Sequence, residues 1–481
     1  MTAGARRRDP SPAAAPDDDL AFVGIARQVD LIKAGEVSPR ELVELYLRRI
    51  ERLDPQLNAF RVVLAERALA EAEQAESRRA AGEERPLLGV PVAIKDNVDV
   101  AGELTPHGTG AFVSPAKEDA EVVRRLRGAG AIVIGKTHLP ELAICGFTES
   151  ATWGVTRNPW NPDRSPGGSS GGSAVAVAAG MVGAAEASDG AGSIRIPAAN
   201  CGLFGLKPQR GRVSLQPDAE HWHGLSVMGC LTRTVLDSAL FLDAVTGAAK
   251  GDAHTPRPLA RPLAESARES PGKLRIAVST RPIIPVLINP EVRRAVAETA
   301  EVLRSLGHHV SERDPAYGMI GNSFVPRYLH GIYEDVARVP RPERLERRTR
   351  GFGRLGRVLS GSPVARAIET ETAHAARINA LFADHDVLLT AVTARPPIEV
   401  GRWEGRGALR TLLGMAAVYP FTGVWNTLGQ PAAAVPAGIG PGGLPLSVQL
   451  VGRPNAEPVL VSLAAQLEAE RPWTDHRPPL S

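Results

Sequence analysis

Two segments rich in glycine and serine, separated by a run of small apolar residues, constrain the fold of this chain most. Residues 165–173 read Ser-Pro-Gly-Gly-Ser-Ser-Gly-Gly-Ser, and residues 188–201 read Ser-Asp-Gly-Ala-Gly-Ser-Ile-Arg-Ile-Pro-Ala-Ala-Asn-Cys. Flexible linkers would not need the tight apolar spacer, residues 174–187, which we interpret as a helix followed by a strand. Glycines beside serines let a substrate approach the main chain closely. The two segments therefore indicate a reaction site.

The second segment can stabilise the negative charge that develops when a carbonyl group is attacked. Successive N–H groups of residues 190–193 can face one anion and so form an oxyanion hole, which acyl transfer requires. A serine hydroxyl is a poor nucleophile unless a base removes its proton. No histidine lies near either segment in the sequence, and we interpret His221 and His223 as loop residues. The base must therefore come from elsewhere.

Lys95 is the candidate base. It stands at the end of an apolar run, residues 88–94, that reads as a strand. Of the 56 basic residues 49 are arginine, so each lysine raises the question of whether arginine could replace it. Arginine keeps its proton in a protein, whereas a buried lysine can lose it. For this chemistry the lysine pKa must fall from about 10.4 toward neutrality, which burial against apolar side chains can achieve.

Two shorter motifs suggest other functions. Residues 130–137 match the phosphate-binding pattern G-x4-G-K-T, but their middle residues read as a strand rather than a loop, which argues against nucleotide binding. Residues 168–172 match G-x-S-x-G, which would make Ser170 the nucleophile of an α/β-hydrolase. That fold needs a later histidine, for which His374, His385 and His476 are available, but no oxyanion segment of the usual kind precedes the serine. Ser170 remains an alternative nucleophile.

Alternating strand and helix patterns predict an α/β fold. The first clear helix begins at the capping box Ser38-Pro39-Arg40-Glu41 and is expected to end at Asp54-Pro55. Further helices are predicted over residues 64–81, 119–126, 290–306 and 457–470, and further strands over 131–134, 274–279, 308–311, 386–392, 431–436 and 444–450. No repeat or clear linker divides the chain, so we expect one domain over residues 21–481 after a disordered tail, residues 1–20.

Composition excludes several classes of protein. Lysine and arginine exceed aspartate and glutamate by only 3, which argues against a nucleic-acid partner. No segment has 18 uninterrupted apolar residues, so no membrane span is predicted. The three cysteines, Cys145, Cys201 and Cys230, fit neither a disulfide framework nor a zinc site, and we interpret them as buried thiols of a cytoplasmic protein. We expect no metal and no cofactor.

The chain resembles the amidase signature family. The resemblance is carried by residues 89–97 with Lys95, 166–174 with Ser169 and 192–197 with Ser193. It continues in residues 205–208, 429–432 and 444–452. The resemblance implies a single large α/β domain in which a mixed twisted β-sheet is covered by helices on both faces. It also allows a homodimer.

The resemblance assigns a role to each residue of the two segments. It implies that Ser193 is the nucleophile, that Ser169 relays protons after a cis peptide bond from Gly168, and that Lys95 is the general base. The oxyanion hole would be formed by Gly190, Ala191 and Gly192. The supporting residues would be Ser170, Asp189 and Arg195. Ala191 stands where the family has glycine, so an unchanged loop geometry requires a negative φ at this residue.

The reaction expected from the resemblance is hydrolysis of a small-molecule amide to an acid and an amine or ammonia. Residues 315–365 and 400–427 are expected to shape the acyl pocket. Aromatic candidates for its walls are Tyr317, Tyr328, Trp403, Tyr419, Phe421 and Trp425. Two alternatives remain open. One is the glutamine-amide-hydrolysing subunit of a tRNA-dependent amidotransferase, which would need partner chains, and the other is a catalytically degenerate scaffold.

Overall fold

The computed structural model describes residues 19–481, so the predicted tail lies outside the described residues except for its last two positions. One of these, Leu20, packs against the core. Among the described helices, none combines the length and the apolar character needed to cross a membrane.

The first β-sheet contains the strands that end at the candidate catalytic residues. In spatial order its strands are β1 (Phe60–Val63), β3 (Ile132–Thr137), β2 (Pro91–Lys95), β6 (Ala184–Asp189) and β8 (Val227–Thr232). The central strand β2 is parallel to both of its neighbours, whereas the outer strands β1 and β8 pair antiparallel. Because β2 and β6 are parallel neighbours, their carboxyl ends lie at the same edge of the sheet.

The second β-sheet is also mixed. In spatial order its strands are β10 (His309–Glu312), β9 (Arg275–Val278), β11 (Val387–Ala391), β13 (Pro445–Gly452), β12 (Ala432–Ile439) and β7 (Gly205–Lys207). Phe204 and Thr232 exchange two backbone hydrogen bonds, of 3.0 and 3.2 Å, and so join the two sheets. The predicted α/β fold is confirmed, with two mixed sheets joined at this bridge. A separate two-stranded sheet consists of β4 (Glu149–Ser150) and β5 (Gly154–Val155).

Helices cover both faces of the first sheet, which explains the apolar strands seen in the sequence. Ala93 points toward α6 (Gly171–Ala178), whose small side chains lie in the same hydrophobic cluster. Val92 and Ile94 point to the opposite face, where they share a cluster with residues of α5 (Glu121–Gly128) and α8 (Val235–Val245). This alternation along one strand is the expected behaviour of a sheet buried on both faces.

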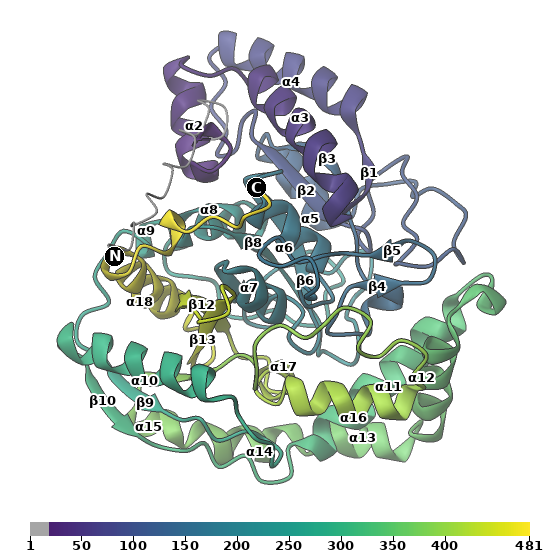
Figure 1. The fold of residues 1–481 in the computed structure, drawn as a ribbon, viewed down its shortest axis with the longest axis vertical. Helices are drawn as coiled ribbons and strands as arrows, with labels where there is room; N and C mark the ends of the chain where they lie inside the picture. Colours follow the sequence, from purple (N-terminus) through teal and green to yellow (C-terminus); the bar gives the residue numbers. More distant parts are fainter. Residues whose placement is uncertain (1–18) are drawn as a thin grey trace, which may run out of the picture.

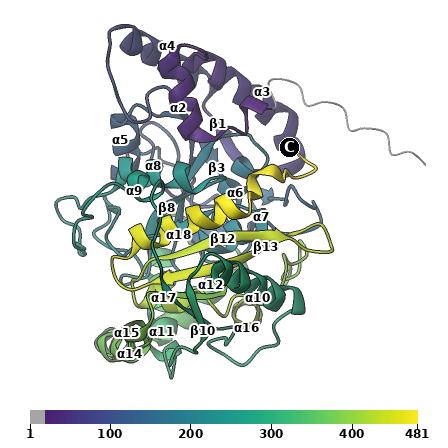
Figure 2. The ribbon, with the colours of Figure 1, turned by 90° about the vertical axis from the view of Figure 1, so that its left-hand side faces the viewer.

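The remaining helices form layers around the two sheets. At one end of the molecule lie α2 (Gly24–Ala34), α3 (Pro39–Leu57) and α4 (Ala65–Ala80), which Figures 1 and 2 both show. Against the second sheet pack α7 (Arg195–Cys201), α10 (Pro290–Ser305) and α18 (Glu457–Glu470). At the opposite end from α4 lie α11 (Gly321–Arg338), α12 (Arg347–Val358), α13 (Ser362–Glu369), α14 (Glu371–Asn379), α15 (Leu381–Asp384) and α16 (Ala408–Val418) (Figure 1). The shorter helices are α9 (Leu263–Ser266), α17 (Gly423–Thr427), η1 (Glu141–Ala143), η2 (Pro342–Arg344) and η3 (Trp473–Asp475).

Helix α3 begins where the sequence predicts but ends later than predicted. The capping box at Ser38 and Glu41 is present, as predicted. The expected end at Asp54-Pro55 was wrong, because the helix continues through Pro55 and ends at Leu57. Asn58 then adopts a left-handed φ of 52° and terminates the helix. The Asp54 carboxylate accepts hydrogen bonds from the N–H groups that follow, at 2.6 Å from Ala59, and so turns the chain into β1.

Candidate active site

The candidate catalytic residues come from three segments that meet at one edge of the first sheet. Lys95 is the last residue of β2, and Ser188 and Asp189 are the last residues of β6. Ser169 lies in the loop before α6, after a cis peptide bond from Gly168, which confirms that prediction. Ser193 lies in the loop that connects β6 to α7. Ser169 and Ser193 line the same cavity, of about 270 Å³.

The Lys95 side chain is fully buried and contacts two serine hydroxyls. Its Nζ lies 2.8 Å from the Oγ of Ser169 and 2.9 Å from the Oγ of Ser188. Burial lowers the pKa of Lys95 to about 7, although the Glu186 and Asp189 carboxylates oppose this by favouring the ammonium form. The lysine can therefore exist as a neutral amine near neutral pH, which a general base requires.

Ser170 supports the loop rather than facing the cavity. Its hydroxyl is buried, donates to the carbonyl oxygen of Ser188 at 3.2 Å and accepts from the N–H of Ser188 at 3.4 Å. Ser170 therefore ties the start of α6 to β6, and Ser169, not Ser170, faces the cavity. This arrangement does not favour the nucleophile-elbow interpretation, because a nucleophile must be accessible to the substrate.

Asp189 holds the loop that carries Ser193. Its carboxylate accepts hydrogen bonds from the N–H of Gly192 at 2.6 Å and of Ile194 at 3.2 Å, and it forms a fully buried ion pair of 3.0 Å with Arg195. Arg195 strongly lowers the pKa of Asp189, against the opposite effect of burial. The amide nitrogen of Asn426 in α17 donates to the same carboxylate at 2.8 Å. The loop is therefore fixed from within and from the second half of the chain.

The backbone of this loop leaves N–H groups available for a substrate oxygen. The N–H of Gly192 is committed to Asp189, but those of Gly190, Ala191 and Ser193 make no hydrogen bond within the described part of the chain. Ala191 is absent from the described non-glycine residues with positive φ, so alanine fits this position without strain. Its carbonyl oxygen accepts a hydrogen bond of 2.6 Å from the Thr422 hydroxyl, which orients the peptide.

The apparent phosphate-binding motif is part of a strand. Residues 132–137 form β3, and every one of them is buried. Lys136 forms a buried ion pair of 3.1 Å with Asp96 and contacts the Thr105 hydroxyl at 2.8 Å. A strand paired on both sides has no loop of convergent N–H groups, so this motif cannot hold a phosphate.

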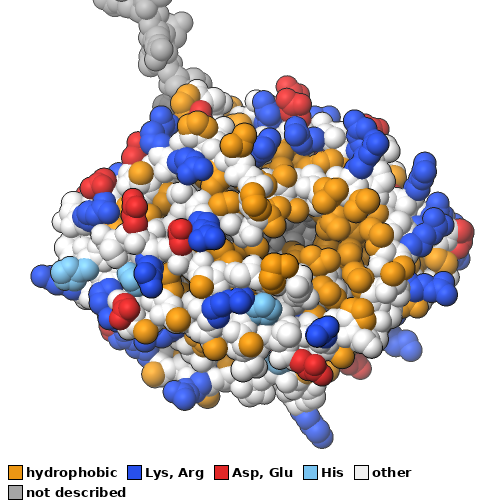
Figure 3. Space-filling view, turned by 90° about the horizontal axis from the view of Figure 1, so that it is seen from below, with side chains coloured by type: hydrophobic (Ala, Val, Ile, Leu, Met, Phe, Trp, Pro, Cys, Tyr) orange, Lys and Arg blue, Asp and Glu red, His pale blue; other side chains and the backbone are white. Residues whose placement is uncertain are grey.

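A larger, mostly apolar cavity of about 440 Å³ is lined by Ser193 but not by Ser169. It is lined by parts of the predicted pocket segments, including Gly321, Phe324 and Tyr328 of α11. Figure 3 shows the molecule from below, with hydrophobic side chains around a hollow in this face. The exposed hydrophobic residues of the structure include Ile284 and Leu413, which also line the cavity. The cavity therefore reaches solvent through an apolar mouth.

The aromatic candidates divide into two groups. Tyr328 and Tyr419 line the apolar cavity. Trp403 instead packs against Phe147, with ring centroids 4.9 Å apart. The other candidates are buried outside the cavity lining, in hydrophobic clusters: Tyr317, Phe421 and Trp425. Core packing is the commoner use of large aromatic residues, and sequence periodicity does not separate the two uses.

The smaller cavity contains polar residues that the sequence analysis did not assign to the site. His221 lines it together with Ser193, and its Nε2 lies 3.2 Å from the Asp335 carboxylate in α11. Burial opposes the charged form of this imidazole, but Asp335 raises the pKa of His221 above its usual value. His107 lines the same cavity, and burial lowers its pKa to about 4. No local motif marks His221, because its partner lies 114 residues away in the sequence.

Comparison with known proteins shows the family of this chain. The family model described as Amidase matches residues 41–461. A protein of Mycobacterium tuberculosis named as an amidase, AmiB2, is 50% identical over 466 residues, which cover 96% of this chain and 99% of that protein. The chain belongs to the amidase signature family. It is an amidase, a hydrolase that acts on carbon–nitrogen amide bonds.

Solved structures match this amidase over nearly its whole length. A 6-aminohexanoate cyclic dimer hydrolase in complex with its substrate superposes with a TM-score of 0.88 at 32% identity, covering 96% of this chain and 99% of that chain. A bacterial aryl acylamidase of the same family superposes with a TM-score of 0.85 at 26% identity, covering 94% and 97%. The 6-aminohexanoate-cyclic-dimer hydrolase of Paenarthrobacter ureafaciens is 33% identical over 480 residues, covering 94% of this chain and 96% of that protein.

Proposed function

We propose that this amidase hydrolyses an amide with an apolar acyl group through an acyl-enzyme on Ser193, with Ser169 as proton relay and Lys95 as general base. The observation that carries the proposal is the contact of 2.8 Å between the buried Lys95 Nζ and the Ser169 Oγ. Ser169 and Ser193 share one cavity, and the lowered pKa of Lys95 supplies a base near neutral pH.

The first half of the reaction forms the acyl-enzyme. Neutral Lys95 takes the Ser169 proton while Ser169 takes the proton of Ser193. The Ser193 oxygen bonds to the carbonyl carbon, and the π electrons of the carbonyl move to its oxygen. Free main-chain N–H groups of Ala191 and Ser193 then stabilise this oxyanion. When the C–N bond breaks, Ser169 gives its proton to the leaving nitrogen and recovers one from the Lys95 ammonium.

The second half uses the same groups in the opposite direction. A water molecule attacks the Ser193 ester and passes its proton through Ser169 to Lys95. The tetrahedral intermediate expels the Ser193 oxygen, which recovers a proton through Ser169. The products are a carboxylic acid and an amine or ammonia, and no metal or cofactor takes part in any step.

The two cavities support one orientation of the substrate. Ser169 lines the smaller cavity but not the larger one, and Ser169 must reach the leaving nitrogen. The amine therefore lies in the smaller, more polar cavity. The acyl group then extends into the apolar cavity of about 440 Å³, beside Ala191. Aliphatic chains in the 6-aminohexanoate cyclic dimer, the substrate of a structural relative, are compatible with such a cavity.

A series of p-nitroanilides with acyl chains from acetyl to octanoyl tests this orientation. Burial of each methylene contributes about 0.8 kcal/mol, which corresponds to roughly a fourfold rise in kcat/KM per methylene while the chain remains in the cavity. Primary amides, aryl amides and the 6-aminohexanoate cyclic dimer complete the panel on the purified chain. A flat dependence on chain length would contradict the acyl assignment, and no turnover of any compound would contradict the proposed hydrolysis.

Gly321 offers a substitution that changes the cavity without touching the catalytic residues. It lines the apolar cavity at the start of α11, and a Cβ added there meets no atom within 4 Å. Gly321→Leu should therefore fill cavity space and shift the preferred acyl chain to a shorter length. Gly128→Leu is the matched control, because Gly128 is exposed at the end of α5 and a Cβ there also meets nothing within 4 Å. An unchanged chain-length profile in Gly321→Leu would place the acyl group elsewhere.

A further inference from the structure

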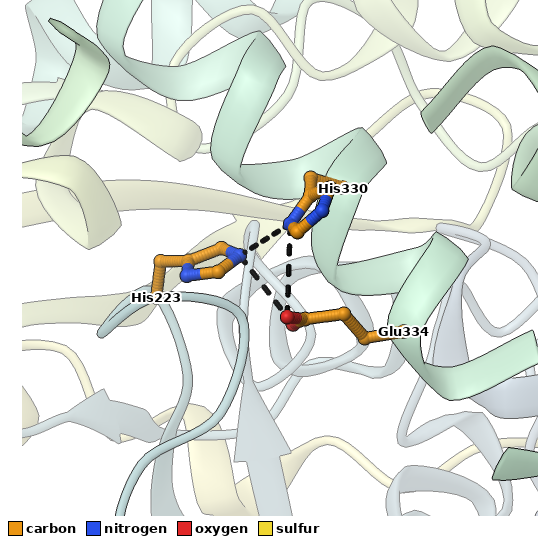
Figure 4. A group of neighbouring side chains, drawn as sticks. All are labelled: His223, His330 and Glu334. Carbon is orange, nitrogen blue, oxygen red and sulfur yellow. Dashed lines mark hydrogen bonds and ion pairs between the residues drawn. The ribbon is translucent and has the colours of Figure 1, made fainter. Parts of the chain in front are cut away.

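Three side chains outside the catalytic machinery converge on one point between two segments of the chain. His330 and Glu334 are one turn apart on α11, and His223 belongs to the loop before β8 (Figure 4). The Nε2 of His223 lies 2.9 Å from the Nδ1 of His330 and 3.4 Å from a carboxylate oxygen of Glu334. The Nδ1 of His330 lies 3.7 Å from the other carboxylate oxygen.

We propose that His223, His330 and Glu334 form a binding site for a divalent transition-metal ion of the zinc type. Two imidazole nitrogens and one carboxylate oxygen are a donor set that suits Zn²⁺ and does not suit Mg²⁺ or Ca²⁺. Tetrahedral ligands about 2.0–2.1 Å from Zn²⁺ lie roughly 3.3 Å from one another. The separations of 2.9, 3.4 and 3.7 Å, the last two measured to different oxygens of Glu334, surround this value, so a rotation of the carboxylate with small adjustments of the imidazoles can place one oxygen and both nitrogens around an ion.

The surroundings of the cluster are compatible with a cation. The side chains of His223 and His330 are 16% and 15% exposed and that of Glu334 is 40% exposed, so an ion can enter from solvent. Arg327 donates from Nε to the carbonyl oxygen of His223 at 2.9 Å, and its charge is paired with Glu371 at 2.5 Å. Arg327 is therefore paired with Glu371, and the Glu334 carboxylate remains available to the ion. Water can supply the fourth ligand.

The position of the cluster indicates what the ion would do. Adjacent residues of the same loop already contact α11, since the indole N–H of Trp222 donates to Asp335 at 2.7 Å. Trp222 lines both cavities, and its ring meets that of Tyr328 edge to face with centroids 5.2 Å apart. An ion at the cluster would lock this loop to α11 and hold the wall of the substrate cavities. It would stabilise the protein without contacting Ser193.

A hydrogen bond between the two imidazoles is the competing interpretation, and metal binding by the full chain separates the two. After treatment with EDTA and dialysis, titration with Zn²⁺ should give one tight site per chain and a higher Tm. Co²⁺ should give the visible bands of a tetrahedral site. His330→Ala should lose the tight site, the Tm rise and the Co²⁺ bands, whereas His254→Ala should keep all three. His254 pairs with Glu220 at 3.3 Å, outside the cluster, and serves as the matched control.

Glu334→Gln keeps the size of the side chain and provides a second variant if His330→Ala does not fold. It should weaken Zn²⁺ binding at least tenfold, and the rise in Tm on addition of Zn²⁺ should be correspondingly smaller than in the wild type. Absence of tight Zn²⁺ binding to the wild-type chain would overturn the proposal. Equal Zn²⁺ affinity of the wild-type chain and of a folded His330→Ala or Glu334→Gln variant would also overturn it, because the bound ion would then lie elsewhere. This inference does not depend on the proposed substrate or mechanism.

Discussion

The pH dependence of kcat/KM reports directly on the buried amine of Lys95. Only the neutral amine can accept a proton, and burial lowers its pKa to about 7. With that pKa, about one-tenth of the enzyme has a neutral lysine at pH 6 and about nine-tenths at pH 8. The kcat/KM value should therefore rise roughly tenfold between pH 6 and pH 8 and remain level above pH 8. An ordinary lysine, with a pKa of about 10.4, would give a tenfold rise per pH unit up to pH 9 and beyond.

Glu186→Gln changes this profile in a defined direction. The Glu186 carboxylate accepts from the Lys95 backbone N–H at 3.2 Å, and its negative charge raises the pKa of the lysine. The two buried groups titrate together, so the apparent pKa belongs to the pair. Glutamine removes the charge, and the acid limb of the profile should move to lower pH. Glu468→Gln is the matched control, because this carboxyl is also mostly buried and accepts from a backbone N–H, of Val235 at 3.2 Å.

Release of p-nitroaniline measured from pH 5.5 to 9.5 provides both profiles. Each variant is checked first for folding by circular dichroism over the same pH range. A wild-type rise that continues tenfold per unit through pH 9 would show that the lysine has an ordinary pKa. An acid limb that shifts equally in Glu186→Gln and Glu468→Gln would show that the catalytic base does not sense Glu186. Either result would refute the reasoning.

Three further predictions follow from contacts in the site. Lys95→Arg should lower kcat/KM by roughly 10²–10⁴-fold, as Lys95→Met should, because arginine stays protonated and cannot act as a base. A kcat/KM of Lys95→Arg clearly above that of Lys95→Met in the p-nitroanilide assay would contradict a base at this position. Asp189→Asn removes one partner of a fully buried ion pair and should lower the free energy of unfolding, measured by urea titration, by about 3–5 kcal/mol. A loss below about 1 kcal/mol would show that another group balances the charge of Arg195. Ala191→Gly keeps the N–H and should leave kcat/KM within about threefold, because alanine already fits the loop; a larger gain would mean that the methyl group distorts the oxyanion hole.

The sequence was sufficient to predict the elements around the reaction centre, for identifiable reasons. Lys95 is the last residue of a strand whose other residues are all apolar, and burial on both faces of β2 requires that composition. The small residues between the two serine segments form α6 and β6, as predicted. The capping box at Ser38 also appears in the structure, because capping depends only on residues close in the sequence. The sequence therefore predicts local structure where the interacting residues are neighbours along the chain.

Features that depend on distant residues could not be predicted. The loop that carries Ser193 is held by Asn426, whose amide nitrogen donates to the Asp189 carboxylate across 237 positions of the chain. His221 lies in a loop without periodicity, and only the fold brings Asp335 beside it. Trp425 and Tyr328 are both aromatic residues of predicted pocket segments, but only Tyr328 lines the cavity. Tertiary packing decides which of two similar side chains faces a substrate.

Covalent labelling with an alkyl fluorophosphonate, followed by peptide mass spectrometry, tests the central claim most directly. Trypsin leaves Ser169, Ser170 and Ser193 in one peptide, residues 165–195, whereas additional cleavage after Glu186 separates Ser193 from the other two. The account predicts one adduct per chain on the peptide that contains Ser193, retained in Ser170→Ala, strongly slowed in Lys95→Met and absent in Ser193→Ala. An adduct on the peptide with Ser169 and Ser170, or undiminished labelling in Ser193→Ala, would contradict it.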